Sequence, residues 1–469
     1  MNPTLSASAL IEALLAELGP LTVLAGDDAP LRNHNDYSGL PASPPLAVVR
    51  PVDTAGVAAA MRLCHEHGVA VVPQGGLTGL CGGARTPAAQ VALSLERMVG
   101  IEEIDSASAT MTVLAGTPLE TIQLAATAAG FFCPLDLGAR GSCSIGGNLA
   151  TNAGGNRVIR YGMAREMVLG IEVVLPDGSV VTSLNKMIKN NAGFDLKHLF
   201  IGSEGTLGII TRVVLRLFPK PASTMVAICA ANDYDNVLTL LNSARQNLGP
   251  LLSAFEVMWP DFWQFATTQV PGVRNPLQGD DTAYGAYVLI EALGTDPVHD
   301  APRFEAWLGQ LLESGVVPNA ALAQSLSDGQ AFWRIRDTTG ELQPQWPGHA
   351  AYDIGLPVAD MDAYVRRCQA MLHAQIPNVQ SVFYGHIGDG NMHINVYQPG
   401  APEQPKDLVN DIVYGLVREY GGTVSAEHGI GTLKRQWLGH ARSPEEIELM
   451  RVIKRALDPQ ALLNPGKVI

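Results

Sequence analysis

Two short segments near the C-terminal end of the chain carry residue types that bind metal ions and move protons. His386 and His393 flank a Gly-Asp-Gly turn, and the pair Glu427-His428 follows further along the chain. Two imidazoles and one carboxylate can hold a divalent ion and leave coordination positions open for a substrate. His428 would then be available to transfer a proton beside the ion. On these residues alone, the pattern is open to both hydrolysis and redox chemistry.

The turn between the two histidines gives a reason to group them. A tight strand–turn–strand would bring both imidazoles to one side. His393 and Asn395 are two residues apart, so on a strand their side chains face the same way. Asp389 lies within the turn, where it can support a ligand or simply shape the backbone.

Composition limits the classes of function. The chain has 469 residues, 47% of them hydrophobic and 16% charged, which predicts two or three globular domains. A net charge of -14 argues against a nucleic-acid partner. Six scattered cysteines without a C-x-x-C pair predict reduced thiols. We find no signal-peptide pattern and no apolar run long enough for a transmembrane segment. We therefore expect a cytoplasmic protein, with a peripheral place at the inner membrane face left open.

Apolar patterning predicts alternating strands and helices. Leucines at helical spacing predict an N-terminal helix at about 5–19, and a second helix is predicted over 54–67. Pro219 and Pro221 break the last strand of the first half and predict a domain boundary there. Ser443 begins a capping-box pattern and predicts a C-terminal helix. The predicted strands are 46–50, 69–72, 91–95, 111–115, 170–175, 209–217, 225–230, 284–291 and 381–385.

Three glycine-rich segments follow or precede these strands. Segment 73–83, with five glycines, lets the backbone adopt positive φ angles and present N–H groups to a phosphate. Segment 134–156 combines small residues with amides and hydroxyls, which suits a backbone lying against a large heteroaromatic ring. Segment 202–210 enters a strand. Neither G-x-G-x-x-G nor G-x-x-x-x-G-K-[ST] occurs, so a Rossmann site and a Walker site both lose support.

These three segments, in this order, resemble the FAD-binding fold of the vanillyl-alcohol-oxidase superfamily. With the two histidines and Glu427-His428, the chain is similar to flavin-linked D-2-hydroxy acid dehydrogenases, which oxidise D-lactate, glycolate or D-2-hydroxyglutarate. The resemblance runs from about residue 40 to the C-terminal Asn464-Pro465-Gly466-Lys467. It implies an α+β fold in three parts. These are a PCMH-type FAD-binding domain of two α/β subdomains over 1–220, an α+β substrate (cap) domain over 221–405, and a C-terminal helical segment over 406–469 that completes the FAD and metal site.

The resemblance also implies which residues bind a non-covalent FAD. No histidine in 73–83 offers a covalent link. The residues implied for the pyrophosphate are Pro73, Gln74, Gly75, Gly76, Leu77, Thr78 and Gly79. Those implied for the isoalloxazine and ribityl portion are Pro134, Asp136, Gly141, Ser142, Ser144, Gly147, Asn148, Thr151, Asn152, Gly154 and Gly155. Glu204, Gly205 and Ile210 would lie near the adenosine half, and Asn464 would close the pocket.

For the chemistry, the resemblance makes His386, His393 and Glu427 the ligands of a divalent metal, zinc or manganese. An ion chelated by a 2-hydroxy acid lowers the pKa of the hydroxyl group. His428 would take the hydroxyl proton, and the hydride would pass to flavin N5. Arg336 matches an arginine that binds the substrate carboxylate, and Asn395 completes the predicted catalytic set. The alternative for Arg336 is an ion pair on a helix surface.

The chain departs from the family pattern at two positions. Ala351 stands where D-2-hydroxyglutarate enzymes carry a lysine, and Gly340 stands where a threonine is expected. Thr338 or Thr339 is close enough in sequence to replace that threonine. His349 is two residues from Ala351 and could replace the lysine expected there. The loss of a cation weakens the assignment of a dicarboxylate substrate.

Two alternatives remain at this stage. One is a metal-dependent hydrolase that uses the same His/Glu cluster, with the glycine loops serving structure only. The other is an FAD subunit of a larger electron-transfer complex of the glycolate-oxidase type. For a dehydrogenase we expect a small 2-hydroxy acid as substrate, an electron acceptor such as quinone or electron-transfer flavoprotein, and a homodimer.

Overall fold

The computed structural model describes residues 3–277 and 283–469, and these form two compact units. Unit 1 comprises Met1–Gly154, Met163–Pro219 and Glu427–Ile469, and unit 2 comprises Gly155–Gly162 and Lys220–Ala426. The chain therefore passes from one unit to the other four times. This division does not test the domain limits drawn from the sequence, which stay predictions.

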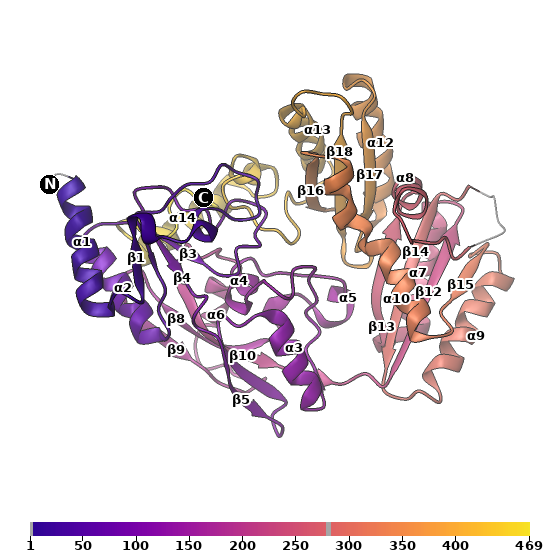
Figure 1. The fold of residues 1–469 in the computed structure, drawn as a ribbon. Helices are drawn as coiled ribbons and strands as arrows, with labels where there is room; N and C mark the ends of the chain where they lie inside the picture. Colours follow the sequence, from indigo (N-terminus) through magenta and orange to yellow (C-terminus); the bar gives the residue numbers. More distant parts are fainter. Residues whose placement is uncertain (1–2, 278–282) are drawn as a thin grey trace. The chain divides into compact units, whose positions relative to one another are not determined.

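Unit 1 contains two main sheets (Figure 1). The first has the strand order β1-β2-β4-β3, with β2 and β3 both parallel to β4. The second is antiparallel throughout, in the order β5-β6-β10-β8-β9. A two-stranded ribbon pairs β11 with β7. The strands are β1 Val23–Ala25, β2 Ala47–Val49, β3 Val71–Gln74, β4 Val91–Ser94, β5 Ile101–Asp105, β6 Thr110–Leu114, β7 Phe131–Phe132, β8 Val168–Val174, β9 Val180–Ser183, β10 Ile209–Arg216 and β11 Phe218–Pro219.

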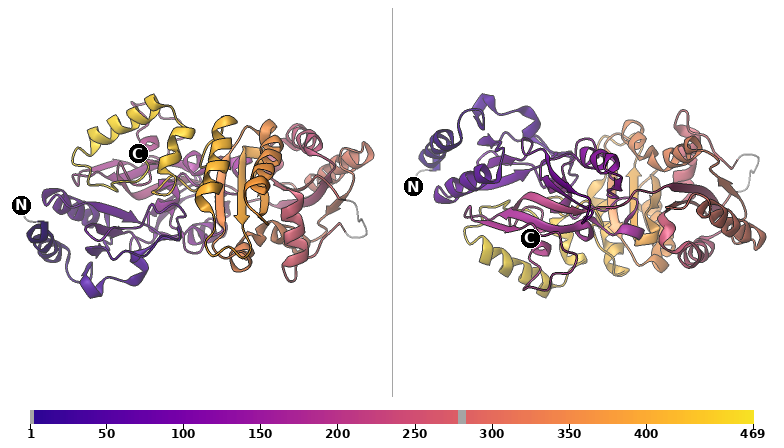
Figure 2. Two further views of the ribbon diagram at one scale, coloured as in Figure 1. Left: turned by 90° about the horizontal axis from the view of Figure 1, so that it is seen from above. Right: turned by 90° about the horizontal axis from the view of Figure 1, so that it is seen from below.

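The helices of unit 1 begin and end at recognisable signals. Asp53 caps the second helix by accepting a hydrogen bond from the Gly56 N–H at 2.8 Å. The last helix has the predicted capping box, with Ser443 and Glu446 bonded to each other's backbone N–H. Figure 2 shows this last helix in yellow, close to the C-terminus. The helices are α1 Pro3–Leu18, α2 Thr54–Glu66, α3 Leu119–Ala128, α4 Ile145–Ala150, α6 Lys197–Phe200 and α14 Pro444–Leu457.

Unit 2 is built on one antiparallel sheet of seven strands in the order β15-β12-β14-β13-β17-β18-β16. Because both of its faces are largely covered, most positions on its central strands are buried. The strands are β12 Ser223–Ala231, β13 Leu252–Met258, β14 Ala286–Gly294, β15 Ala320–Leu322, β16 Ala350–Gly355, β17 Gln380–Gly385 and β18 Asn391–Tyr397. The helices are α5 Val158–Tyr161, α7 Tyr234–Leu248, α8 Pro260–Gln264, α9 Asp300–Glu313, α10 Leu326–Arg336, α11 Leu342–Gln345, α12 Met361–Gln375 and α13 Lys406–Glu419.

The short helix α5 reaches unit 2 from the first half of the sequence. Arg157, just before it, forms a bidentate pair with the carboxylate of Glu291 on β14, at 2.9 and 3.2 Å. Ser253 and Trp333 also donate to Glu291, at 2.8 and 3.1 Å. A nearly buried acid inside an apolar strand is thus fully paired, and the pairing anchors α5.

The structure confirms most of the elements expected from patterning. Strands occur at all nine predicted positions, with ends that differ by a few residues, and helices occur at the predicted N-terminal, second and C-terminal positions. In the part of the chain that the structure describes, no helix combines the length and apolarity that a bilayer crossing requires.

Candidate functional site

The first two glycine-rich segments pack directly against each other in unit 1. A Cβ atom at Gly76 would lie 2.1 Å from the Ser142 carbonyl oxygen, and one at Gly75 would lie 2.4 Å from Ser144 Oγ. No side chain fits in either place. Leu77, in the same loop, has a positive φ of 63°, a conformation that costs a non-glycine residue free energy. The sequence pattern therefore produces a close backbone approach, as a nucleotide cradle requires.

Polar atoms in these segments fit a bound FAD. Ser144 Oγ and Asn464 Oδ1 are buried and have no hydrogen-bond partner among the described residues. Buried polar atoms are nearly always paired in native proteins, so unpaired ones indicate a missing ligand or water. Both residues belong to the set predicted to contact FAD. The Ser144 hydroxyl can donate or accept and Asn464 Oδ1 can accept, so both could bond to a polar ligand such as FAD.

The C-terminus ties the predicted pyrophosphate loop in place. Asn464 Nδ2 donates to the Glu204 carbonyl at 2.7 Å. Lys467 Nζ donates to the carbonyls of Gly82, Gly83 and Arg85 at 3.0, 3.1 and 2.9 Å. Burial lowers the pKa of Lys467 to about 8. Lys467 was quoted in the sequence motif, but nothing in the sequence showed that it anchors this loop.

Other predicted cofactor residues differ in what their side chains do. Gln74 is buried, and its Nε2 donates to the carbonyls of Asn33 and Ala84 at 3.0 Å each. Its side chain thus stabilises the first glycine-rich segment through contacts with the protein. Asn152 Oδ1 accepts the Arg165 N–H at 2.9 Å. Gly155 alone of the set belongs to unit 2, while the rest belong to unit 1. The contacts of these residues with FAD remain predictions.

In unit 2, the two histidines occupy the strand–turn–strand that the sequence predicted. His386 follows β17, a 3₁₀ turn at Ile387–Asp389 (η8) comes next, and His393 lies within β18. The two ring centroids are 5.3 Å apart and the rings are nearly perpendicular, at 85°. Both side chains are almost buried, with 4% and 9% of their surface exposed. Asp389 is exposed in the turn.

A buried acid holds His386 in one orientation. Glu256 on β13 has no exposed surface, and its Oε1 lies 2.5 Å from His386 Nδ1. Burial alone would raise the pKa of Glu256, but its interactions with His386 and Arg336 outweigh burial and hold the pKa at about 2. An ionised carboxylate only accepts, so Nδ1 must carry the hydrogen. His386 Nε2 is then the atom that can accept or ligate.

Arg336, the last residue of α10, completes this buried group. Its Nε donates to Glu256 Oε2 at 2.8 Å, and its Nη2 donates to His386 Nε2 at 3.2 Å. Burial would lower the pKa of Arg336, but attraction to Glu256 raises it. The side chain is only 9% exposed, which overturns the alternative of an ion pair on a helix surface. Nη1 is the guanidinium nitrogen that these bonds leave for a substrate carboxylate.

A second acid, Asp353, lies beside His393. Asp353 on β16 is opposite His393 on β18 and is fully buried. Its Oδ1 accepts from Asn391 Nδ2 at 2.8 Å, and its Oδ2 accepts from Ser425 Oγ at 3.1 Å. Ser425 lies two residues before Glu427 in the sequence.

These residues form a group with the composition of a metal site. Asp353, His393, Glu427 and His428 each offer one ligand atom, and the four atoms lie within 4.8 Å of one another. His393 and Glu427 belong to the predicted ligand set. Asp353 was not predicted, and His386 lies outside this group, although its ring is next to that of His393. Mixed imidazole and carboxylate donors suit zinc or manganese.

Asn395 lies two residues beyond His393, as expected for the same face of β18. It is 4% exposed, and its Nδ2 donates to the Tyr384 hydroxyl at 3.3 Å. Ala351 is exposed on β16, directly opposite Asn395. Burial lowers the pKa of His349 and so favours its neutral form, which makes it a poor replacement for a missing lysine. Thr338, in the 3₁₀ turn Asp337–Glu341 that follows α10, donates its hydroxyl to the Ile335 carbonyl of α10 at 2.8 Å.

Sequence reasoning missed two functional candidates, Glu256 and Asp353. Each is an acid within an otherwise apolar strand. Such a residue is costly to bury unless it is paired, so its presence is a usable signal. The signal indicates that a partner exists but not which one.

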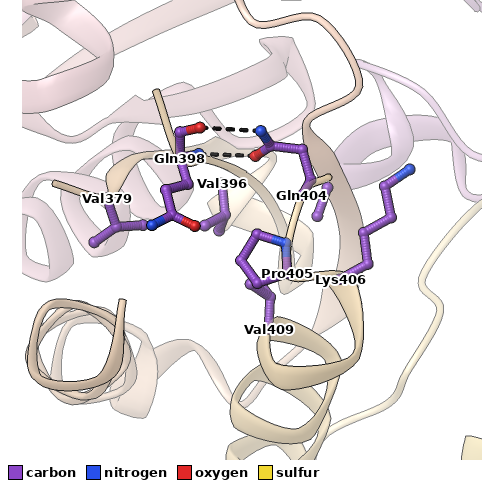
Figure 3. Close-up of a pocket in the computed structure, with 8 residues that line it drawn as sticks. Val379, Val396, Gln398, Gln404, Pro405, Lys406 and Val409 are labelled. Atoms are coloured by element: carbon purple, nitrogen blue, oxygen red, sulfur yellow. Dashed lines mark hydrogen bonds between the residues drawn. The ribbon is translucent and has the colours of Figure 1, made fainter. Parts of the chain in front are cut away.

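A small pocket elsewhere in unit 2 has a different character. It lies among Ala350 of β16, Val396 of β18 and Val409 of α13 (Figure 3). At its edge the Gln398 N–H donates to Gln404 Oε1 at 2.8 Å, and Gln404 Nε2 donates to the Gln398 carbonyl at 3.0 Å. None of the predicted site residues lines it, so it has no place in the candidate chemistry.

Comparison with known proteins agrees with this geometry. Residues 45–183 match the family model "FAD binding domain", and residues 220–468 match "FAD linked oxidases, C-terminal domain". These matches define a flavin-dependent oxidoreductase. They confirm the predicted α+β class with its PCMH-type FAD-binding domain.

Relatives narrow the class further. The chain is 39% identical over 453 residues to a probable mitochondrial D-2-hydroxyglutarate dehydrogenase of Oryza sativa subsp. indica, covering 96% of this chain and 80% of that one. It is 35% identical over 430 residues to a putative mitochondrial D-lactate dehydrogenase of Schizosaccharomyces pombe, covering 90% and 81%. The chain belongs to the FAD-linked oxidase family. The fold also matches a crystal structure of p-cresol methylhydroxylase with substrate bound, with a TM-score of 0.78 and 18% identity over 99% of this chain and 96% of that one.

The glycine loops yield a first prediction. In Gly76→Ala, the new Cβ would collide with the Ser142 carbonyl, a backbone atom that cannot move alone. We expect FAD affinity to fall roughly tenfold, because such overpacking costs about 1–3 kcal/mol. The measurement is the FAD-to-protein ratio after dialysis. Gly138→Ala is the matched control, because a Cβ at Gly138 meets nothing within 4 Å and Gly138 is not among the residues predicted to bind FAD. Equal FAD loss in both variants would contradict the prediction.

The turn between the histidines yields a second prediction. A Cβ at Gly388 would lie 2.5 Å from Ile159 Cδ1 and 3.2 Å from Phe255 Cβ. We expect Gly388→Ala to lower the free energy of unfolding by about 1–3 kcal/mol through overpacking. Ile159→Ala removes the closer of these two atoms. We therefore expect Gly388→Ala to lower the free energy of unfolding less in the Ile159→Ala background than in the wild-type protein. Chemical denaturation measures both, and strictly additive effects would show that α5 does not press on this turn.

Proposed function

We propose that this protein oxidises a D-2-hydroxy acid to the 2-oxo acid with FAD and a divalent metal. The observation that carries the proposal is the joint placement of His386, Arg336 and Glu256 in a chain of the FAD-linked oxidase family. An arginine for a carboxylate and a histidine with one oriented nitrogen lie side by side. A 2-hydroxy acid presents the matching groups, a carboxylate and an adjacent hydroxyl.

Each residue has a role in this proposal. Arg336 binds the substrate carboxylate through the guanidinium edge that Glu256 leaves open, and this binding orients the reacting carbon. His386, His393 and Glu427 would hold the metal, zinc or manganese, with His386 binding through Nε2 in place of the hydrogen bond from Arg336 Nη2. When bound, such an ion lowers the pKa of the substrate hydroxyl. His428 accepts the hydroxyl proton, and Asn395 donates a hydrogen bond on the same face of β18. Bound FAD supplies the hydride acceptor.

The proposal also concerns whether the substrate carries one carboxylate or two. The relatives' names favour D-2-hydroxyglutarate or D-lactate. Strands β16, β17 and β18 carry no lysine or arginine, and Ala351 is exposed at the position where a cation is expected. A second carboxylate would gain no ion pair from these strands. We therefore keep both D-lactate-like and D-2-hydroxyglutarate-like acids as candidates.

The surroundings of the reaction are also part of the proposal. We infer that electrons leave to an acceptor such as quinone or electron-transfer flavoprotein, and that a homodimer works in the cytoplasm or at the inner membrane face. An FAD subunit of a larger complex remains an alternative. The hydrolase alternative is disfavoured, because it needs the glycine loops to be structural only, whereas 45–183 match an FAD-binding domain.

Flavin reduction by a panel of D- and L-2-hydroxy acids tests the proposed reaction. Under anaerobic conditions, D-lactate or D-2-hydroxyglutarate should bleach the flavin absorbance, and the L-enantiomers should not. Metal-stripped protein should lose this bleaching and regain it with Zn²⁺ or Mn²⁺. A flavoprotein that no 2-hydroxy acid reduces would end the proposal. Bleaching that survives complete metal removal would end the role of the metal alone.

The proposed base can be tested separately. We expect His428→Asn to slow substrate-driven flavin reduction about 100-fold or more, the usual contribution of a positioned base. FAD content and reduction by dithionite should not change. His373→Asn, at an exposed position on α12, is the matched control. The outcome that rejects the role is a reduction rate in His428→Asn within a factor of a few of the wild-type rate.

A further inference from the structure

The carboxylate of Glu204 points to a role different from the one that its sequence motif suggests. The motif Gly202-Ser203-Glu204-Gly205 resembles an FAD-contacting segment. In the structure, however, Glu204 Oε1 accepts the Ile430 N–H at 2.6 Å, and Oε2 accepts the Gly431 N–H at 2.8 Å. Both oxygens are thus engaged by the backbone that directly follows Glu427-His428.

We propose that Glu204 is a positioning residue that holds segment 429–431 and thereby sets the orientation of Glu427 and His428. This inference rests on the proposed function, in which those two residues serve the metal and the proton. All the contacts that carry it lie within unit 1.

The receiving segment is shaped for this contact. Gly429 has a φ of +79°, and a Cβ there would lie 2.7 Å from Glu204 Oε1. Gly431 has a φ of +51°, and a Cβ there would lie 2.2 Å from the Cys81 carbonyl oxygen. Any side chain at either position would force the backbone away from its neighbour. Glycine is therefore required at both by contact as well as by conformation.

Cys81, in the first glycine-rich segment, contacts the same segment 429–431 from another side. Its Sγ donates to the Gly429 carbonyl at 3.2 Å. Its carbonyl accepts the N–H groups of Thr432 and Leu433 at 2.8 and 3.1 Å. Segment 429–433 is consequently held by backbone and carboxylate contacts on both sides, which leaves little freedom to the two residues just before it.

Glu204 itself is rigidly placed. Its N–H donates to the Ala150 carbonyl at 2.7 Å, and its own carbonyl accepts from Asn464 Nδ2 at 2.7 Å. Its φ of +51° is unusual for a non-glycine residue, and these two bonds sustain it. Burial raises the pKa of Glu204, whereas the N–H donors of Ile430 and Gly431 lower it. Glu204 thus links the segment carrying Glu427-His428 to the core of unit 1.

Glu204→Gln tests the inference. An amide can accept one N–H through its oxygen, but its NH₂ group then faces the other N–H, and a backbone donor cannot reverse its role. In metal-stripped, FAD-loaded protein titrated with Zn²⁺, we expect the dissociation constant to rise on the order of tenfold, as for groups that orient metal ligands. The kcat for substrate-driven flavin reduction should fall more than KM changes, and FAD content should stay at the wild-type level.

The matched control is Glu172→Gln. Glu172 is a nearly buried carboxylate of unit 1, but its hydrogen-bond donors are the hydroxyls of Thr54, Thr182 and Thr211. Arg212, 3.6 Å away, also pairs with Glu102 and so keeps a partner in Glu172→Gln. A hydroxyl can turn and accept, so this amide is tolerated. Gly429→Ala provides an independent variant. It should weaken Zn²⁺ binding as Glu204→Gln does, and the double variant should cost less than the sum of the two.

Hydrogen exchange separates this inference from the proposed function. Amide exchange in peptides that contain Ile430 and Gly431 should speed up in Glu204→Gln but not in Glu172→Gln, whatever the protein catalyses. Wild-type protein that binds no Zn²⁺ and is bleached by no 2-hydroxy acid would refute the proposed function. Unchanged exchange would refute the proposal that Glu204 holds segment 429–431. Loss of FAD with unchanged Zn²⁺ affinity would also refute it, and would indicate that Glu204 contacts the cofactor instead.

Discussion

The buried carboxylate of Glu256 is the interaction on which the candidate site in unit 2 depends. An isolated charge in this environment would be strongly unfavourable, so it must be balanced at once. Arg336 and His386 balance it, and each of them is in turn oriented by the acid. Loss of any one member would leave a buried charge or donor without its partner. The three side chains therefore behave as a unit, contributed by β13, α10 and the end of β17.

This dependence explains why the strands pair as they do. Val257 on β13 lies opposite Gly385 on β17, which places Glu256 next to His386. A slip of one residue would turn Glu256 to the other face of the sheet and break the group. The turn after His386 is held too, because Arg245 donates to the Gly388 carbonyl at 2.8 Å. Sheet register and ion pairing thus specify the same geometry.

Features with a local cause could be predicted from the sequence. The glycine loop at 73–83, the strand–turn–strand around the two histidines and the capping box at Ser443 all arise from residues close together in the chain. Their backbone geometry follows from glycine conformations and caps, which neighbouring residues determine. The fold class followed because several such features occur in one order.

Long-range pairs could not be predicted in the same way. Glu256 precedes His386 by 130 residues, and Glu204 precedes Ile430 by 226. The sequence marks Glu256 and Asp353 as acids inside apolar strands, but it does not say which donor each one meets. Glu204 is a different case, because its motif predicts a cofactor contact, which stays a prediction, while its carboxylate bonds to backbone N–H groups that the sequence did not indicate.

Acids near the proposed metal site therefore fall into two groups, those that could bind the ion and those that position other residues. Glu256 and Glu204 have both oxygens bonded to donors of the chain, and neither belongs to the group with the composition of a metal site. Each holds a segment whose other side chains face the proposed chemistry, one within unit 2 and one within unit 1. In each unit, the residues proposed to react are thus oriented by a carboxylate that has no role in the reaction itself. A count of the acids and histidines in the sequence therefore overestimates the number of metal ligands. Some buried acids position other side chains and are not ligands themselves.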